Sequence, residues 1–245
     1  MSDRIAIEVK NLCVDYRDLG SYSIKQMLLR GKKRKQEDFH AVKNVSFNVD
    51  RGEILGIIGK NGCGKSTMLR TIAGIMSPNS GTIDLHNNTV SLLSIGVGFN
   101  KNITGRENII LSGMLLGFSK EYMLERMDAI IKFSELGNFI DKPVRTYSSG
   151  MYSKLAFSVT VNLDAEVILV DEVLSVGDEH FRKKSLAKMK SMINEEDRTV
   201  IIVSHSIKTL RELCTKVMWM HDGEIVKIGE PKPTLREYRQ FMRSL

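Results

Sequence analysis

The sequence predicts an α/β fold in which parallel strands form a core, with an antiparallel β lobe and an α-helical subdomain attached to it. The first observation is the segment at 59–66, which has the pattern G-x-x-x-x-G-K-[ST] of a phosphate-binding loop. The second is its setting, because an apolar run at 53–58 precedes it and apolar residues at helical spacing follow at 67–73. The third is a pair of apolar runs, 167–170 and 199–203, that suit buried parallel strands.

The chemistry of the loop depends on its glycines and on the two residues that end it. Gly59, Gly62 and Gly64 permit tight or left-handed backbone conformations, so the loop amides can point at phosphate oxygens. The following helix adds positive potential at its N-terminus. Lys65 is expected to reach the β- and γ-phosphates, and Ser66 to offer its hydroxyl to Mg²⁺. The simpler alternative is a glycine-rich turn with a chance lysine.

Composition limits the class of protein. The chain has 245 residues, of which 42% are hydrophobic, enough for one α/β domain with a small additional lobe. It contains no run approaching the roughly 18 apolar residues of a membrane span and no apolar N-terminal signal, so we expect the protein in the cytosol. Cys13, Cys63 and Cys214 are too far apart in the sequence to suggest a disulfide framework or a zinc site.

The formal net charge of +7 is compatible with nucleic acid, anionic lipid or an acidic substrate as a partner. Much of the excess lies in one cluster from Arg30 to Lys35, which favours a local contact. Just before the cluster, Ile24, Met27 and Leu28 share one face of a predicted short helix. Two interpretations stay open: a surface loop with solvated charges, or a helix at the headgroup level beside anionic lipid.

The first half of the chain is expected to supply most of the strands of the β lobe. Strands are predicted, in chain order, at 5–9 with an extension at 12–16, at 42–49, at 82–85 and at 89–93. The segment 42–49 alternates apolar and polar side chains, as a half-buried strand does. The last two segments are expected to pair as a hairpin across residues 86–88.

The middle of the chain is predicted to be helical. Thr104 and Glu107 have the capping-box spacing, so a helix should begin there, and a second helix is expected at 120–133. The remaining predicted elements are helices at 147–163, 181–193 and 234–242, buried strands at 166–170 and 199–203, and a hairpin of 217–221 with 224–228.

A second group of polar residues follows the predicted parallel strands. Asp171 and Glu172 come directly after one strand, and His205 follows another. The carboxyl ends of parallel strands form the edge at which open α/β sheets bind ligands. Ser148 and Gly150, with Ser149 between them, open a helix and offer a further anion site. Two copies arranged head-to-tail could therefore complete each other's phosphate sites.

In this order, the motifs resemble the nucleotide-binding subunit of ABC transporters over nearly the whole chain. The matches are Walker A at 59–66, the signature at 147–151, Walker B at 167–171, the D-loop at 175–178 and the switch histidine His205. The resemblance implies a P-loop NTPase (RecA-like) core that uses ATP and Mg²⁺. It also implies a single ABC ATPase domain over residues 1–245, with a helical subdomain at about 104–162 and an N-terminal insertion at about 20–40.

The resemblance also implies roles for individual residues. Catalysis falls to Glu172, His205 and Lys65, and Mg²⁺ binding to Ser66 and Asp171. The nucleotide-binding residues of one copy would be Gly59, Lys60, Asn61, Gly62, Cys63, Gly64, Lys65, Ser66, Thr67 and Tyr16, with Ser148, Ser149 and Gly150 of the opposite copy.

Two positions stay open within this assignment. Phe39 is the alternative to Tyr16 as the aromatic residue that stacks on adenine. The family usually has a glutamine between Val90 and Glu107, and this chain has none there. Asn100 lies in that interval and is assigned no role.

The signature and the segments at 104–109 and 171–178 resemble the branch that exports cell-surface polysaccharides, such as O-antigen, capsule and teichoic acid. This implies a lipid-linked glycan as the transported molecule and a separate transmembrane permease as a partner, at the cytoplasmic face of the cell membrane. The N-terminal insertion would contact the membrane surface. The alternative is a soluble ABC-type ATPase acting on nucleic acid or the ribosome. A nucleic-acid partner is not expected, because the chain contains neither a long coiled coil nor a second cassette.

Overall fold

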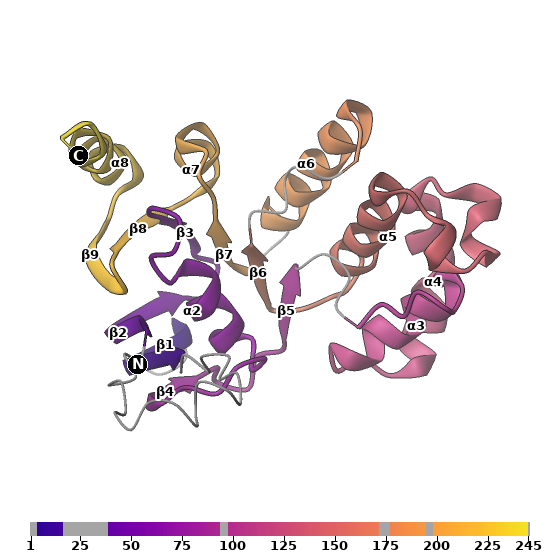
Figure 1. Cartoon of the computed structure of the whole chain (residues 1–245), viewed down its shortest axis with the longest axis horizontal. Coiled ribbons are helices and arrows are strands. Elements are labelled where there is room, and N and C mark those ends of the chain that lie inside the picture. Colours follow the sequence, from indigo (N-terminus) through magenta and orange to yellow (C-terminus); the bar gives the residue numbers. More distant parts are fainter. Residues whose placement is uncertain (1–3, 17–38, 94–97, 172–176, 195–197, 245) are drawn as a thin grey trace, which may run out of the picture.

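The computed structural model describes residues 4–16, 39–93, 98–171, 177–194 and 198–244. Its strands form two sheets, a three-stranded sheet and a six-stranded sheet, and its helices cover the larger sheet and build a separate lobe (Figure 1). The α/β fold with an antiparallel β lobe and a helical subdomain, as predicted from the sequence, is confirmed.

The antiparallel lobe has the strand order β2-β1-β4. These strands are β1 (Ile5–Tyr16), β2 (Phe39–Asp50) and β4 (Ser80–Asp84). The two predicted segments at 5–9 and 12–16 are one strand, in which Asn11 takes a left-handed conformation with φ 49° and interrupts the register with β2. Along β2, Val45, Phe47 and Val49 are buried while the residues between them are exposed, as the alternation predicted.

The larger sheet has the strand order β5-β6-β7-β3-β8-β9. Its strands are β3 (Ile54–Ile58), β5 (Val90–Leu93), β6 (Val167–Asp171), β7 (Thr199–Val203), β8 (Lys216–His221) and β9 (Glu224–Gly229). All pairs are parallel except the hairpin of β8 and β9. The two central strands β3 and β7 are buried along their whole length, which explains their continuous apolar sequences.

Two apolar cores lie on opposite faces of this sheet. In β7, Ile201 and Val203 pack toward the antiparallel lobe and α2 (Lys65–Ile72), whereas Val200 and Ile202 pack against the other core. That second core includes side chains of α6 (Glu179–Asn194), α7 (Ile207–Leu213) and α8 (Pro231–Arg243). Figure 1 shows α2 and the lobe on one side of the sheet and these three helices on the other.

The helical subdomain lies beside the β5–β6 end of the sheet (Figure 1). It contains α3 (Gly105–Leu115), α4 (Lys120–Ser134), the 3₁₀ turns η2 (Gly137–Asp141) and η3 (Val144–Thr146), and α5 (Ser149–Val161). Thr104 begins α3 through the predicted capping box, in which its side chain accepts from the Glu107 amide and the Glu107 carboxylate accepts from the Thr104 amide. A third apolar core joins α3, α4 and α5.

The predicted hairpin of 82–85 with 89–93 is wrong. Strand β4 pairs with β1 in the small sheet, and β5 pairs with β6 in the large one. His86 and Asn87, at φ 47° and 62°, turn the chain so that it passes from one sheet to the other. Helix α7 was not predicted, although Ser206 caps it by accepting from the Thr209 amide.

Four predicted features lie wholly or partly outside the described residues. They are the short helix with Ile24, Met27 and Leu28, the basic cluster that follows it, Glu172, and the first half of the D-loop at 175–176. Within the described part of the chain, no helix has the length and apolar character needed to cross a membrane.

Candidate nucleotide-binding site

The phosphate-binding loop connects β3, at the centre of the large sheet, to α2. Gly62 and Gly64 have φ 80° and 95°, a region that residues with a Cβ atom rarely adopt. A Cβ on Gly64 would stand only 2.0 Å from the carbonyl oxygen of Ala41, whereas a Cβ on Gly62 would meet nothing within 4 Å. Gly64 is therefore required both for its backbone angle and for the close approach of β2.

Lys65 is a buried residue with a charged side chain, since only 6% of its surface is exposed. Its ammonium group donates to the carbonyl oxygens of Gly59 at 2.8 Å and Lys60 at 2.7 Å, and lies 3.9 Å from the Cys63 sulfur. No carboxylate pairs with it among the residues that the structure describes. Because a buried cation is costly without an anion, this group is suited to bind a phosphate that enters the loop.

Ser66 and Asp171 are brought together across the edge of the sheet. The Ser66 hydroxyl donates to Asp171 Oδ1 at 2.9 Å, although the two residues are far apart in the sequence. Asp171 is the last residue of β6, and Ser66 lies in the first turn of α2. A hydroxyl and a carboxylate are the hard oxygen ligands that Mg²⁺ prefers, so the pair fits the predicted metal site.

A pocket at the mouth of the loop gathers the predicted residues of this edge. It is lined by Phe39, Asn61, Gly62, Gly64, Lys65, Ser66, Thr67, Val203 and His205. His205 follows β7 as predicted and faces the same pocket as the loop. Gly59, Lys60 and Cys63 are not among these lining residues, and the Lys65 ammonium contacts all three. Burial raises the pKa of the Cys63 thiol despite the nearby Lys65 ammonium.

Both candidate adenine-stacking residues lie at this mouth. Tyr16 and Phe39 are partners in the β1–β2 pairing, and their ring centroids are 6.4 Å apart. Phe39 lines the pocket and is 55% exposed. Tyr16 lies beside the start of α2, where its hydroxyl forms a hydrogen bond with the Thr67 hydroxyl at 3.1 Å. The geometry therefore offers a pair of rings rather than a single one.

The signature residues do not join this pocket. Ser148 caps α5 by accepting a hydrogen bond from the Met151 amide at 3.2 Å, and Ser148 and Ser149 are exposed. The space beside Gly150 is open, because a Cβ added there would have the Ser148 hydroxyl oxygen, at 3.8 Å, as its single neighbour within 4 Å. Figure 1 shows α5 in the helical subdomain, on the far side of β5 and β6 from α2.

Asn100 is not among the residues that line the pocket. The Asn100 side chain is engaged locally, since its Oδ1 accepts from the Asn102 amide at 2.9 Å. Val203, which lines the pocket, was not singled out from the sequence. No sequence signal could have found it, because it reads as one more apolar residue of a buried strand.

The chain is similar to known ATP-binding proteins. The family model described as "ABC transporter" matches residues 42–175. An O-antigen export system ATP-binding protein from Myxococcus xanthus is 43% identical over 214 residues, which cover 86% of this chain and 49% of that protein. A teichoic acids export ATP-binding protein from Enterococcus faecalis is 48% identical over 204 residues, covering 83% of this chain and 45% of that protein.

A shorter relative is covered more fully. The O-antigen export system ATP-binding protein of Klebsiella pneumoniae is 39% identical over 215 residues, which cover 88% of this chain and 85% of that protein. By contrast, the chain spans about half the length of the Myxococcus and Enterococcus proteins. The alternative function on nucleic acid or the ribosome receives no support from these names.

Solved structures support the fold. The dimeric ATP-binding cassette MJ0796, in a post-hydrolysis state with ADP and phosphate, superposes with a TM-score of 0.73. The two sequences are 22% identical, and the match covers 92% of this chain and 99% of that one. At this identity the likeness establishes the architecture of the chain and nothing more specific.

Proposed function

Because this chain belongs to the ABC transporter family, we propose that it is the ATP-hydrolysing subunit of an exporter that moves a lipid-linked cell-surface polysaccharide. Its curated relatives are named for export of O-antigen or of teichoic acids, which are both cell-envelope glycans. The proposed cargo is the class that these two share.

The observation that supports ATP binding best is the environment of Lys65. Its buried ammonium group is held only by backbone carbonyl oxygens and a thiol among the described residues, beside the N-terminus of α2. An arriving triphosphate would replace those weak partners with a charge-assisted contact. The loop amides and the start of the helix add positive potential at the same point.

The other residues of the proposed site have separate roles in hydrolysis. Ser66 and Asp171 would hold a magnesium ion, and the ion would neutralise negative charge that builds up on the phosphates. Glu172, the next residue in the sequence, accepts a proton from the attacking water. His205 lies at the pocket where the γ-phosphate would sit and hydrogen-bonds to it.

The proposed active form contains two copies, with Ser148, Ser149 and Gly150 of one copy closing the nucleotide site of the other. The separation of α5 from the phosphate-binding loop within one chain supports this arrangement (Figure 1). The exposure of both serines does so as well. Each copy would be one nucleotide-binding domain over residues 1–245, with the helical subdomain at about 104–162.

The proposed location is the cytoplasmic face of the cell membrane, through a separate permease subunit. The word "export" in the names of the relatives supports a partner that spans the membrane. Contact of the insertion at about 20–40 with the membrane surface is a further proposal that rests on its basic sequence alone.

Hydrolysis of MgATP by the purified chain tests the proposed activity. Glu172→Gln should retain ATP binding but lower turnover by about 10²–10⁴-fold, because the amide cannot accept the proton of the water. Lys65→Ala should lose nucleotide affinity. Lys232→Ala is the matched control, since Lys232 is an exposed lysine of α8 and does not line the pocket. Turnover by Glu172→Gln at the wild-type rate would refute the assignment of the base.

A further inference from the structure

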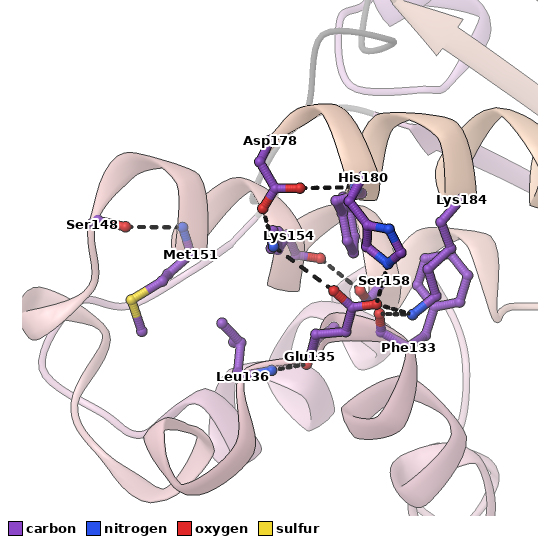
Figure 2. A network of polar contacts seen from close by, with 12 residues as sticks. Phe133, Glu135, Leu136, Ser148, Met151, Lys154, Ser158, Asp178, His180 and Lys184 are labelled. Carbon is purple, nitrogen blue, oxygen red and sulfur yellow. Dashed lines mark hydrogen bonds and ion pairs between the residues drawn. The ribbon is translucent and has the colours of Figure 1, made fainter.

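Three helices meet at a group of charged residues outside the nucleotide pocket (Figure 2). The group, called here the three-helix ion network, comprises Glu135, Lys154, Asp178, His180 and Lys184. Glu135 ends α4, Lys154 belongs to α5, and the others lie at or near the start of α6. The proposed hydrolysis mechanism uses none of them.

Glu135 occupies an unusual backbone position. It is the C-terminal cap of α4 and takes a left-handed conformation with φ 57°. Glycine or asparagine commonly fills such a position, because a longer side chain strains the backbone there. A residue that keeps a strained conformation indicates that its side chain is needed.

The Glu135 carboxylate meets cations from two other helices. Its Oε1 accepts from Lys184 Nζ at 2.7 Å and lies 3.7 Å from His180 Nε2, both on α6. Its Oε2 lies 3.8 Å from Lys154 Nζ on α5. Lys184 also donates to the Phe133 carbonyl in the last turn of α4, at 3.0 Å. One carboxylate therefore fixes the relative positions of α4, α5 and α6.

Lys154 extends the network to Asp178. Its ammonium group donates to Asp178 Oδ2 at 2.6 Å, and its side chain is only 16% exposed. The other oxygen of Asp178 accepts from the Phe181 amide at 2.9 Å and so caps the start of α6. Figure 2 shows Lys154 between Glu135 and Asp178.

The ammonium groups of Lys154 and Lys184 lie over a cluster of phenylalanine rings. Phe133, Phe157 and Phe181 pack against one another, and two of their three contacts are edge-to-face. The Lys154 ammonium lies 5.1 Å from the Phe181 ring centroid, and that of Lys184 lies 4.6 Å from the Phe133 centroid. These cation–π contacts restrict where the lysine heads can go.

The position of Lys154 in the sequence connects the three-helix ion network to the proposed nucleotide site. It stands one helical turn after Gly150, on the helix that begins with the signature. Asp178 follows Glu172, the proposed base, by a short stretch of chain. The Lys154–Asp178 contact is thus a direct link between the helix that would touch the opposite copy's nucleotide and the chain that leads away from the base.

We propose that Lys154 is a positioning residue for ATP hydrolysis. It is held in place by Glu135, and it fixes the position of α5 relative to the start of α6. When Ser148 and Gly150 engage the nucleotide of the other copy, movement of α5 reaches Asp178 through Lys154. The inference rests on the proposed function, because it assigns a role within that same hydrolysis cycle.

A purely structural role makes different predictions. Asp178 is 57% exposed at its side chain, and ion pairs at such exposure contribute little to stability. If the network only supported the fold, its loss would change the unfolding temperature slightly and leave turnover alone. A positioning role requires turnover to fall while single-copy nucleotide binding and folding are kept.

The test compares Lys154→Met, Lys154→Arg and wild type as full chains. Methionine keeps the packing on Phe181 but removes the charge, so kcat for MgATP should fall by about tenfold or more. Affinity for MgADP, measured by titration calorimetry, should stay within about twofold, because one copy provides the phosphate loop. Lys154→Arg should recover most of the turnover. Lys183→Met is the matched control and should match wild type, since among the described residues the ion pair of Lys183 is with Glu179 of the same helix, at 3.0 Å.

Glu135→Gly provides a second test that does not depend on tolerance of Lys154 changes. Glycine suits the left-handed cap, so the thermal midpoint should hold or rise while kcat falls. If the wild type hydrolyses ATP and either Lys154→Met or Glu135→Gly does so at the wild-type rate, the inference about Lys154 is overturned. The proposed function would be unaffected by that result. A wild type that hydrolyses no ATP would instead overturn the proposed function and this inference with it.

Discussion

Two glycines of the phosphate-binding loop differ in what a side chain would meet. Both Gly62 and Gly64 have positive φ, so alanine strains the backbone at either position. Only at Gly64 would the added carbon also collide with a backbone carbonyl, that of Ala41. The two positions therefore separate the effect of backbone strain from that of steric exclusion.

We expect Gly62→Ala to destabilise the loop by about 1–2 kcal/mol and to retain ATP binding, because only the conformational strain is added. Gly64→Ala should abolish measurable ATP binding, since β2 and the loop cannot both keep their positions. Binding of a fluorescent ATP analogue and thermal unfolding measure the two effects. Equal loss of binding in both variants would contradict the assigned role of the close approach.

The sequence predicted the residues of the loop because their pattern is local and its spacing is specific. It also placed Asp171 near Ser66, because both follow strands whose carboxyl ends share one edge. It could not choose between Tyr16 and Phe39, since that depends on how β1 pairs with β2 across an intervening segment. The two rings turn out to be cross-strand neighbours.

At the scale of elements, most boundaries follow from short-range signals. Thr104, Ser119, Ser148 and Ser206 each cap the helix that follows, and the capping box at Thr104 is the one of these signals from which a helix start was predicted. The error at β4 and β5 has a different origin. Two short strands separated by a tight turn favour a hairpin locally, but β1 and β6 offer each strand a better-buried partner in a different sheet.

The cap at the start of α6 leads to a pH prediction. The hydrogen bond from Lys154, aided by the Phe181 amide, lowers the pKa of Asp178 to about 2. A depressed carboxyl pKa stabilises the native state above the unfolded value, near 4, and this contribution is lost as the pH falls toward 2. Because the Asp178 side chain is 57% exposed, Asp178→Asn should flatten the decline of unfolding free energy below pH 4 only slightly.

Urea unfolding at a series of pH values between 5 and 2 measures that slope. Asp128→Asn, at an exposed aspartate of α4, is a control for the loss of one acidic residue. The Asp128→Asn slope should stay close to that of the wild type. An Asp178→Asn slope identical to that of the wild type would show that the contact with Lys154 does not persist in solution.

At the scale of the whole molecule, the two proposed halves of a nucleotide site lie apart on one chain. The phosphate loop faces the edge of the large sheet, and the signature opens α5 in the helical subdomain (Figure 1). The order of the motifs in the sequence already suggested that two copies share their sites. It could not show the distance between the halves, because that depends on how the helical subdomain packs.

Mixing two inactive variants tests the sharing directly. Lys65→Ala removes the phosphate contact, and Ser148→Arg blocks the signature, so each variant alone should be inactive. In a head-to-tail pair of the two variants, one site combines an intact loop with an intact signature. We expect ATP hydrolysis to return on mixing, as measured by phosphate release. If the mixture releases phosphate no faster than the two separate variants together, the result would argue against shared sites.

Replacement of the chain in its native cell shows whether its ATP hydrolysis drives glycan export. The wild-type copy would be replaced by Glu172→Gln, with Lys232→Ala as the control, and lipid-linked glycan would be quantified inside the cell and at its surface. The account predicts accumulation inside and loss from the surface with Glu172→Gln alone. Unchanged surface glycan, together with a defect in translation or DNA repair, would contradict it.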